Sequence, residues 1–126
     1  MDLKNYFETT TGLSILATAD SDGNVDLAVY SRPHVLDGET VAFIMADRLS
    51  HRNVQSNPKA AFLFKEDGGG YKGIRLYIEK IGEEKNSPLI DEMRKKKHGT
   101  DTAGEEKDRF LVRFRVTSTR PLTGDR

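Results

Sequence analysis

The segment Arg48–Asn53 carries the residues of this sequence that are best suited to bind an anion. Ser50 favours the N-cap of a short helix that ends at Asn57-Pro58. A helix N-terminus presents unpaired backbone N–H groups and the positive end of the helix dipole, and this arrangement binds phosphate. Arg48 and Arg52 flank the position, and arginine offers a planar fork of donors that matches phosphate oxygens. The plainer alternative is a capped helix with solvated charges, which the local pattern taken alone favours.

Other side chains that could do chemistry are scattered along the chain. His34, His51 and His98 show no ligand spacing, and cysteine is absent, so the sequence disfavours a transition-metal site and excludes a thiolate nucleophile. No nucleophile elbow, Walker motif or Rossmann fingerprint is present. The glycines at 68–70 lack the Lys-Ser/Thr pair that follows in a phosphate-binding loop. If the protein is an enzyme, a cofactor is therefore expected to supply the chemistry.

The composition narrows the class of protein. A length of 126 residues predicts one domain spanning 1–126. The 20 basic and 20 acidic residues give zero net charge, which argues against binding nucleic acid through overall positive charge. No apolar run approaches the roughly 20 residues that cross a bilayer, and the first residues lack the apolar stretch of a signal peptide. We therefore expect a cytoplasmic protein that does not bind membranes.

The apolar content is low for a chain of this length. Only 36% of the residues are hydrophobic, whereas a domain of this size buries roughly two-thirds of its extended surface. The apolar segments cluster between residues 13 and 81 and again at 110–116, and the polar excess lies in residues 82–109. A partner subunit or a bound organic cofactor would supply the missing burial.

The alternation of apolar and polar residues predicts a mainly β protein with a few short helices. Asp22-Gly23 and Asp37-Gly38 are typical hairpin turns, and Pro33 is expected to end the strand before it or to bend it at a sheet edge. Short strands joined by such turns favour a closed or half-closed antiparallel barrel. Six strands are predicted at 13–19, 25–31, 41–46, 60–64, 74–79 and 110–116. Three helices are predicted, from Asp2 to Gly12, from Ser50 to Asn57, and from Ser87-Pro88 to Gly99, with a polar segment at 100–107.

Three segments, taken in order and spacing, resemble one family. Leu16–Gly23 resembles the opening hairpin of the pyridoxamine 5'-phosphate oxidase-like FMN-binding split barrels, and Val41–Ala46 resembles a following strand. Arg48–Ala61 is similar to the phosphate segment of that family, in which a Ser/Thr and a basic residue precede an Asn-aliphatic pair and then Asn-Pro. The resemblance covers residues 11–80 and the final strand. It implies a six-stranded antiparallel FMN-binding split barrel that forms a homodimer, with one FMN at each edge of the interface.

The resemblance also implies positions for the cofactor. The phosphate and ribityl chain would lie near Arg48, Ser50, His51 and Asn53. The isoalloxazine ring would lie along Tyr30, Ser31 and Arg32 on one strand and along Ile44 and Met45 on the next. The region from Tyr71 to Tyr77 of the other subunit would close the pocket. The family often carries lysine where this chain has Ser50, so Arg48 or Arg52 would supply that charge.

The resemblance implies a small flavoprotein, an oxidoreductase or an electron carrier. True pyridoxamine phosphate oxidases are longer and have a C-terminal substrate segment with tryptophan, which this chain lacks, so vitamin B6 oxidation is not expected. The alternative is a split barrel that binds haem, deazaflavin or flavin without catalysis, for storage or sensing. A third hypothesis is an oligonucleotide-binding barrel that uses Arg113 and Arg115, which the zero net charge disfavours.

Overall fold

The structure, a computed structural model, describes residues 1–98 and 108–124. Gly99 and the segment 100–107, for which a helix end and a polar stretch were predicted, lie outside the described residues. None of the described helices is long and apolar enough to cross a membrane. The elements in chain order are α1 (Leu3–Thr9), β1 (Gly12–Ala19), β2 (Val25–Tyr30), β3 (His34–Val35), β4 (Thr40–Ala46), α2 (Leu49–Ser56), β5 (Lys59–Glu66), β6 (Gly73–Lys85), α3 (Pro88–His98) and β7 (Arg109–Pro121).

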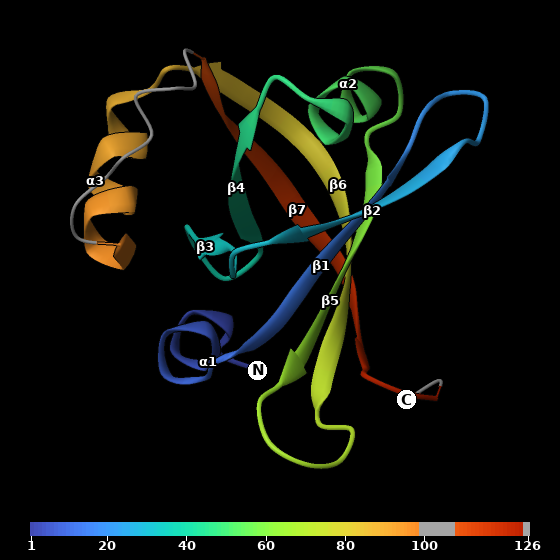
Figure 1. The fold of residues 1–126 in the computed structure, drawn as a ribbon, viewed down its shortest axis with the longest axis vertical. Coiled ribbons are helices and arrows are strands. Elements are labelled where there is room, and N and C mark those ends of the chain that lie inside the picture. The colour runs from blue at the N-terminus through green and yellow to red at the C-terminus, as the bar shows by residue number, and fades with distance from the viewer. Residues whose placement is uncertain (99–107, 125–126) are drawn as a thin grey trace.

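The strands form one antiparallel sheet in the order β2-β1-β5-β6-β7-β4-β3. The sheet curls into a half-barrel, with α2 and α1 at opposite ends and α3 beside the β4 side (Figure 1). The predicted mainly β fold with short helices is therefore confirmed. The predicted number of strands is wrong by one, because the short strand β3 was not predicted.

The additional strand results from the break at Pro33. Proline has no N–H to donate to a ladder, and β2 ends at Tyr30 before it. The chain then re-enters the sheet at the opposite edge, where His34 pairs with Ala42 of β4. The β2–β3 connection thus joins the two edges of the curled sheet.

The two longest strands extend well beyond the predicted segments. Strands β6 and β7 have 13 residues each and pair along most of their length, with irregularities at Tyr77/Ile78 and Lys80/Gly82. The second half of each strand is polar and leaves the core, so hydrophobic alternation marked only the buried first half. The sequence therefore predicted where both strands begin, to within one residue, but not where they end.

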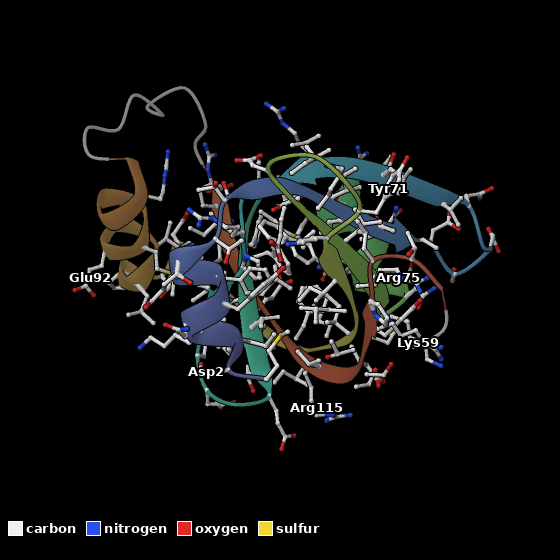
Figure 2. All side chains as sticks on the ribbon, turned by 90° about the horizontal axis from the view of Figure 1, so that it is seen from below. Asp2, Lys59, Tyr71, Arg75, Glu92 and Arg115 are labelled. Atoms are coloured by element: carbon white, nitrogen blue, oxygen red, sulfur yellow. The ribbon has the colours of Figure 1, made fainter. Side chains whose placement is uncertain are left out.

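The core is built from aromatic side chains on the inner face of the sheet. Phe43 lies at its centre, with ring centroids 5.3 Å from Phe62 and 5.8 Å from Phe114. Phe7 of α1 and Val54 of α2 pack into the same cluster from the two ends. Figure 2 shows side chains filling the space enclosed by the ribbon, with charged residues such as Arg115 at the periphery. The packing therefore fixes both helices that border the open side of the half-barrel.

The helix starts show which capping predictions hold. Asp2 caps α1 as predicted, accepting a hydrogen bond from the backbone N–H of Asn5 at 3.1 Å. The Ser87 hydroxyl accepts one from the N–H of Leu89 at 3.2 Å, as expected for the start of α3. Gly12 does not end α1, since the helix stops at Thr9 and Gly12 opens β1. Asp2 and Ser87 bond to backbone N–H groups only three and two residues further along the chain, so the local sequence pattern was enough to identify both caps.

Candidate cofactor-binding groove

Two adjoining cavities lie between β2 and β4, where the half-barrel is open. The first has a volume of about 300 Å³ and extends to Met93 and Arg94 of α3, and we call it the α3 cavity. The second has a volume of about 420 Å³ and extends to Arg48 at the start of α2, and we call it the α2 cavity. Four residues line both cavities, so the two form one groove: Val29, Tyr30, Ile44 and Arg109.

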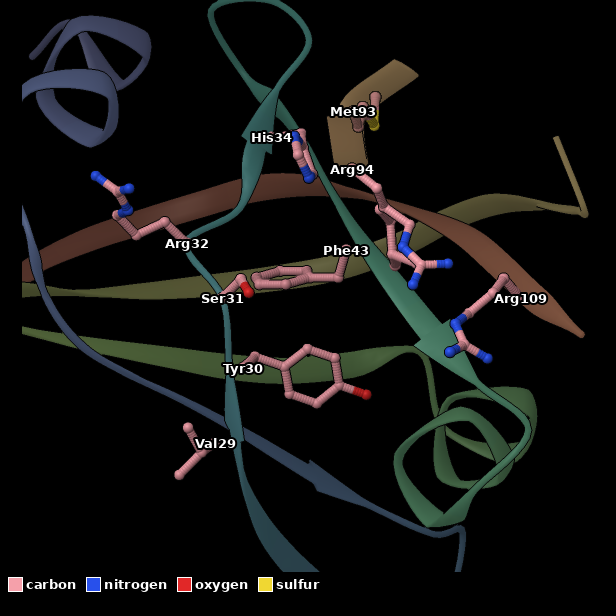
Figure 3. A pocket seen from close by; sticks show the side chains of 10 residues that line it. Val29, Tyr30, Ser31, Arg32, His34, Phe43, Met93, Arg94 and Arg109 are labelled. Carbon is pink, nitrogen blue, oxygen red and sulfur yellow. The ribbon is translucent and has the colours of Figure 1, made fainter. Parts of the chain in front are cut away.

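Tyr30 lies in the middle of this groove. Its ring packs edge-on against Phe43, with centroids 5.8 Å apart, and its hydroxyl points toward α2 (Figure 3). Burial raises the pKa of Tyr30, and the negative charge of Asp26 raises it further, whereas a hydrogen bond with Ser50 acts in the opposite direction. Tyr30 is therefore a neutral phenol at physiological pH, a group that can donate or accept a hydrogen bond beside a planar ligand.

The bond to Tyr30 shows why Ser50 does not cap α2. The N-cap is Arg48, whose backbone is extended and whose side chain makes no capping hydrogen bond. Ser50 is the second helical residue and is buried against β2. The prediction that Ser50 caps the helix is wrong, because a tertiary partner engages the hydroxyl. The N–H groups of the first turn are still directed toward the helix N-terminus, where Arg48, Leu49 and Ser50 line the α2 cavity.

Six of the nine residues that the resemblance implied line the groove. The other three lie elsewhere. Met45 is fully buried in the core, because neighbouring residues on a strand face opposite sides and Ile44 already faces the groove. Asn53 is buried on the inner side of α2 and donates to Thr18 Oγ1 at 3.0 Å. The six that line it are Tyr30, Ser31, Arg32, Ile44, Arg48 and Ser50.

Arg32 borders the groove with only part of its side chain. Its Nη1 donates to the carbonyl oxygens of Phe7 at 2.7 Å and Thr10 at 2.6 Å. These carbonyls lie at the C-terminal end of α1, where a cation is favourable. Figure 3 shows the guanidinium directed away from Tyr30 and Phe43. Arg32 therefore secures α1 to the β2–β3 connection rather than presenting its charge to the groove.

His51, the third residue outside the groove, joins α2 to β6. Its ring stacks on Phe110 with centroids 3.7 Å apart and planes at 16°. Its Nε2 lies 3.1 Å from Glu83 Oε2. Glu83 also accepts from Gln55 at 2.9 Å and pairs with Lys80 Nζ at 2.9 Å. This cluster holds the first turn of α2 against the sheet. It thereby also positions the end of the groove that Arg48 lines, the α2 cavity.

The Glu83 cluster predicts acid-dependent stability. Partial burial would raise the pKa of Glu83, but hydrogen bonds from Gln55, Lys80 and His51 outweigh it and lower the pKa to about 2. A lowered folded-state pKa stabilises the protein above the unfolded value, near 4.5, and this contribution is lost as the pH falls toward 2. We expect Glu83→Gln to remove about 1–2 kcal/mol of this pH dependence, because the side chain is partly exposed and screened.

Urea unfolding from about pH 6 to pH 2.5 measures this difference. The matched control is Glu84→Gln, because the Glu84 side chain is half exposed and its pair with Arg113 spans 3.6 Å. Parallel pH profiles for wild type and Glu83→Gln would contradict the prediction.

Three residues of the α3 cavity with nitrogen-bearing side chains were not predicted as site residues: His34, Arg94 and Arg109. In the sequence Arg94 belongs to a basic run that is typical of a solvated helix end. Arg109 precedes the last predicted strand and reaches the groove only because it pairs with Ala46 across the β4–β7 ladder. The position of Arg109 at the groove depends on the register between β4 and β7, which no local sequence pattern reveals.

Comparison with known proteins identifies the fold. No protein-family model matches the sequence, and no curated protein matches it significantly. Among solved structures, an FMN-binding protein from Syntrophomonas wolfei subsp. wolfei matches with a TM-score of 0.76 at 19% identity, over 99% of this chain and 86% of that one. HupZ from Group A Streptococcus matches with a TM-score of 0.70 at 19% identity, over 98% and 91%. The chain has the fold of the FMN-binding split barrels.

An F420 reductase shares this split-barrel fold, with a TM-score of 0.69 at 18% identity over 91% of this chain and 94% of that one. The fold predicted from the opening hairpin, the buried strand and the Arg48–Ala61 segment is therefore confirmed. At identities below 20%, these matches establish how the chain folds.

Proposed function

We propose that this protein binds FMN in the groove between β2 and β4 and works as a flavin-dependent oxidoreductase or electron carrier. The observation that carries the proposal is that one groove connects a helix N-terminus bearing Arg48 to a strip formed by Val29, Tyr30 and Ile44. An elongated ligand with a phosphate at one end and a flat ring at the other suits this arrangement. The likeness to an FMN-binding protein over nearly the whole chain supports it.

The phosphate end is the α2 cavity. Arg48 lines this cavity, and Arg109 lies at its border with the α3 cavity. Asp26 lines the same cavity and offsets part of the positive charge of the arginines. The backbone N–H groups in the first turn of α2 therefore supply further hydrogen-bond donors for the phosphate. Arg52 is exposed and lines neither cavity. Of the two arginines that the sequence left open, Arg48 is the better candidate for the phosphate contact.

The ring end follows β2 and β4. Where the two cavities meet, Val29 and Ile44 offer apolar contact and the Tyr30 hydroxyl offers a hydrogen bond. Ser31 lies next to Tyr30 on the α3 side of this strip. FMN, when bound, supplies a ring that accepts or delivers a hydride or single electrons. The residues of this chain bind the phosphate, orient the ring and limit its contact with water.

A second copy of the chain is proposed to cover the outer face of β2. Three aliphatic residues there are largely exposed: Val25 at 82%, Leu27 at 70% and Val29 at 73%. Across the sheet Leu27 aligns with Ala17, Ala61 and Tyr77. Removing such apolar surface from water favours association. Val29 belongs to both this face and the groove, so a partner that packs on this face would border the flavin. The region around Tyr77 of that partner would help to close the flavin site.

The visible spectrum of the purified protein, before and after FMN is added, tests the proposal. We expect a shifted flavin spectrum and quenched flavin fluorescence at one FMN per chain. A colourless protein that leaves the FMN spectrum unchanged would contradict flavin binding. Reduction of a dye acceptor by NADH in the presence of the FMN-loaded protein would separate an oxidoreductase from the non-catalytic alternative. Titration with F420 in parallel tests a deazaflavin as the ligand.

The phosphate contact predicts the effect of Arg48→Ala. A hydrogen bond to a charged group contributes about 1.5–3 kcal/mol, so FMN affinity should fall by about 10- to 100-fold. Fluorescence titration with FMN measures the change. Arg52→Ala is the matched control, since Arg52 is four residues further along the same helix and outside the groove. Equal affinities for wild type and Arg48→Ala would remove Arg48 from the site.

A further inference from the structure

The α3 cavity differs in charge from the rest of the groove. Among the described residues that line it, three are arginines, one is a histidine and none is acidic. The guanidinium of Arg32 is bound to the carbonyls of α1 and points away from the cavity, so the positive charge beside the cavity comes from Arg94 and from Arg109, whose Nη1 also donates to the carbonyl oxygen of Asp108 at 3.3 Å. The α2 cavity, by contrast, combines its arginines with Asp26. The groove is therefore most strongly cationic at the end away from the proposed phosphate site.

Helix α3 holds Arg94 in this position. Ile90 is 3% exposed and packs with Ala42 and Leu111, and Met93 and Ile44 pack against the same cluster. This packing fixes the face of α3 that borders the cavity, and Arg94 follows Met93 directly. Arg94 thus projects from an anchored helix rather than from a loop.

Strand pairing and a hydrogen bond to the Asn86 side chain hold the backbone of Arg109 in place beside the cavity. Arg109 pairs with Ala46 in the β4–β7 ladder, and its backbone N–H donates to Asn86 Oδ1 at 3.0 Å. Figure 3 shows the guanidinium groups of Arg94 and Arg109 on the same side of the cavity, with His34 above and Tyr30 opposite. Two guanidinium groups brought together from different elements form an environment that favours an oxyanion.

Part of the remaining wall of the α3 cavity is apolar. Phe43, Ile44 and Met93 line it beside the charged groups. Its volume of about 300 Å³ is at the small end of the range for ligand sites. The cavity therefore suits a small molecule with an apolar body and one anionic end.

We propose that the α3 cavity is the substrate subsite and binds the carboxylate of a small organic acid between Arg94 and Arg109, with its apolar body toward Ile44 and Met93. As a substrate site this rests on the proposed binding of FMN in the adjoining part of the groove. The carboxylate contact itself depends only on residues of this chain. It can therefore be tested with and without the flavin.

Benzoate and benzamide test the subsite, because they share a ring and differ in charge. Isothermal titration of the purified protein, with and without saturating FMN, measures both affinities. We expect benzoate to bind at least tenfold more tightly than benzamide. The double variant Arg94→Gln/Arg109→Gln should lose this preference, and Arg115→Gln should keep it. Arg115 is a matched control, since it lies on β7 with a half-exposed side chain that pairs with Glu79 at 3.7 Å.

The outcomes separate this proposal from flavin binding. Equal binding of benzoate and benzamide to the wild type, or binding of neither, would overturn the subsite whether or not the double variant folds. Competition between benzoate and FMN would also overturn it, because the arginines would then hold the cofactor phosphate. Preferential benzoate binding by a protein that does not bind FMN would support the carboxylate site and contradict the proposed flavin function. Simultaneous binding of both, with a benzoate-dependent change in the flavin spectrum, is the result that we expect.

Discussion

Replacing Leu27 with aspartate is expected to prevent formation of the proposed dimer and to weaken FMN binding by at least tenfold. Leu27 lies in the middle of β2, between Val25 and Val29, and 70% of it is exposed in the isolated chain. In the proposed dimer this side chain is buried against the second copy. Sedimentation velocity and a fluorescence titration with FMN measure the two effects.

The size of the effect follows from the burial of a charge. Full burial of a leucine contributes about 1.5–3 kcal/mol, and this is lost in the variant. An unpaired carboxylate in an apolar interface adds a penalty of several kcal/mol. Each 1.4 kcal/mol is a factor of about ten in the dissociation constant, so the dimer should weaken by at least a hundredfold. FMN binding decreases with it because Val29 joins the outer face to the groove.

Ile81→Asp provides the control for this variant. Ile81 is also an aliphatic strand residue, 50% exposed, but it lies beside the turn at Asp37 and Gly38. The Ile81→Asp variant should leave both the dissociation constant of the proposed dimer and the affinity for FMN unchanged. A monomeric wild type, or a Leu27→Asp variant that remains dimeric, would contradict the proposed interface.

The exposed face of β2 shows where the chain lacks burial of its few apolar residues. Only 36% of the residues are hydrophobic, yet Val25, Leu27 and Val29 lie largely exposed on one strand. A sequence with few apolar residues would use them in the core if the isolated chain were the functional unit. The sequence indicated that a partner or a cofactor completes the burial, and the structure adds the surface on which this would occur.

Predictions that depended on short-range patterns agree with the fold. The turn at Asp22-Gly23 forms where it was predicted, with Gly23 at a φ of 85° and the Asp20 carboxylate accepting from two backbone N–H groups. The strand at 41–46 is buried on both faces, as its uninterrupted apolar run predicted. These features are determined by neighbouring residues, so a single sequence reveals them.

Predictions that depended on contacts between distant elements were less complete. Strand β3 has only two residues, and it exists because β4 offers it a pairing partner. Ser50 has the sequence pattern of an N-cap, but Tyr30, twenty residues earlier in the chain, determines its position. Arg94 and Arg109 line the same cavity because α3 packs on β4 and β7. Local propensity is a weak guide wherever tertiary packing selects the partner.

Replacing Gly73 with alanine is expected to destabilise the fold by about 2–5 kcal/mol. Gly73 opens β6 opposite Lys65 of β5, with a φ of 153°, a conformation that side chains rarely adopt. A Cβ at this position would overlap the carbonyl oxygen of Phe64. Phe64 is fully buried in the core, so neither strand can move away without loss of packing.

Gly69→Ala is the matched control for this substitution. Gly69 lies in the same β5–β6 loop, and a Cβ there would have nothing within 4 Å. It should change the free energy of unfolding by less than about 1 kcal/mol, with a small gain expected from the lower entropy of the unfolded chain. Urea unfolding followed by circular dichroism compares the variants. Equal free energies of unfolding for Gly73→Ala and Gly69→Ala would mean that β5 and β6 do not approach each other as closely as the half-barrel requires. A large difference between the two free energies of unfolding would support the close β5–β6 pairing at Gly73. This pairing is part of the curled sheet whose open side forms the groove between β2 and β4.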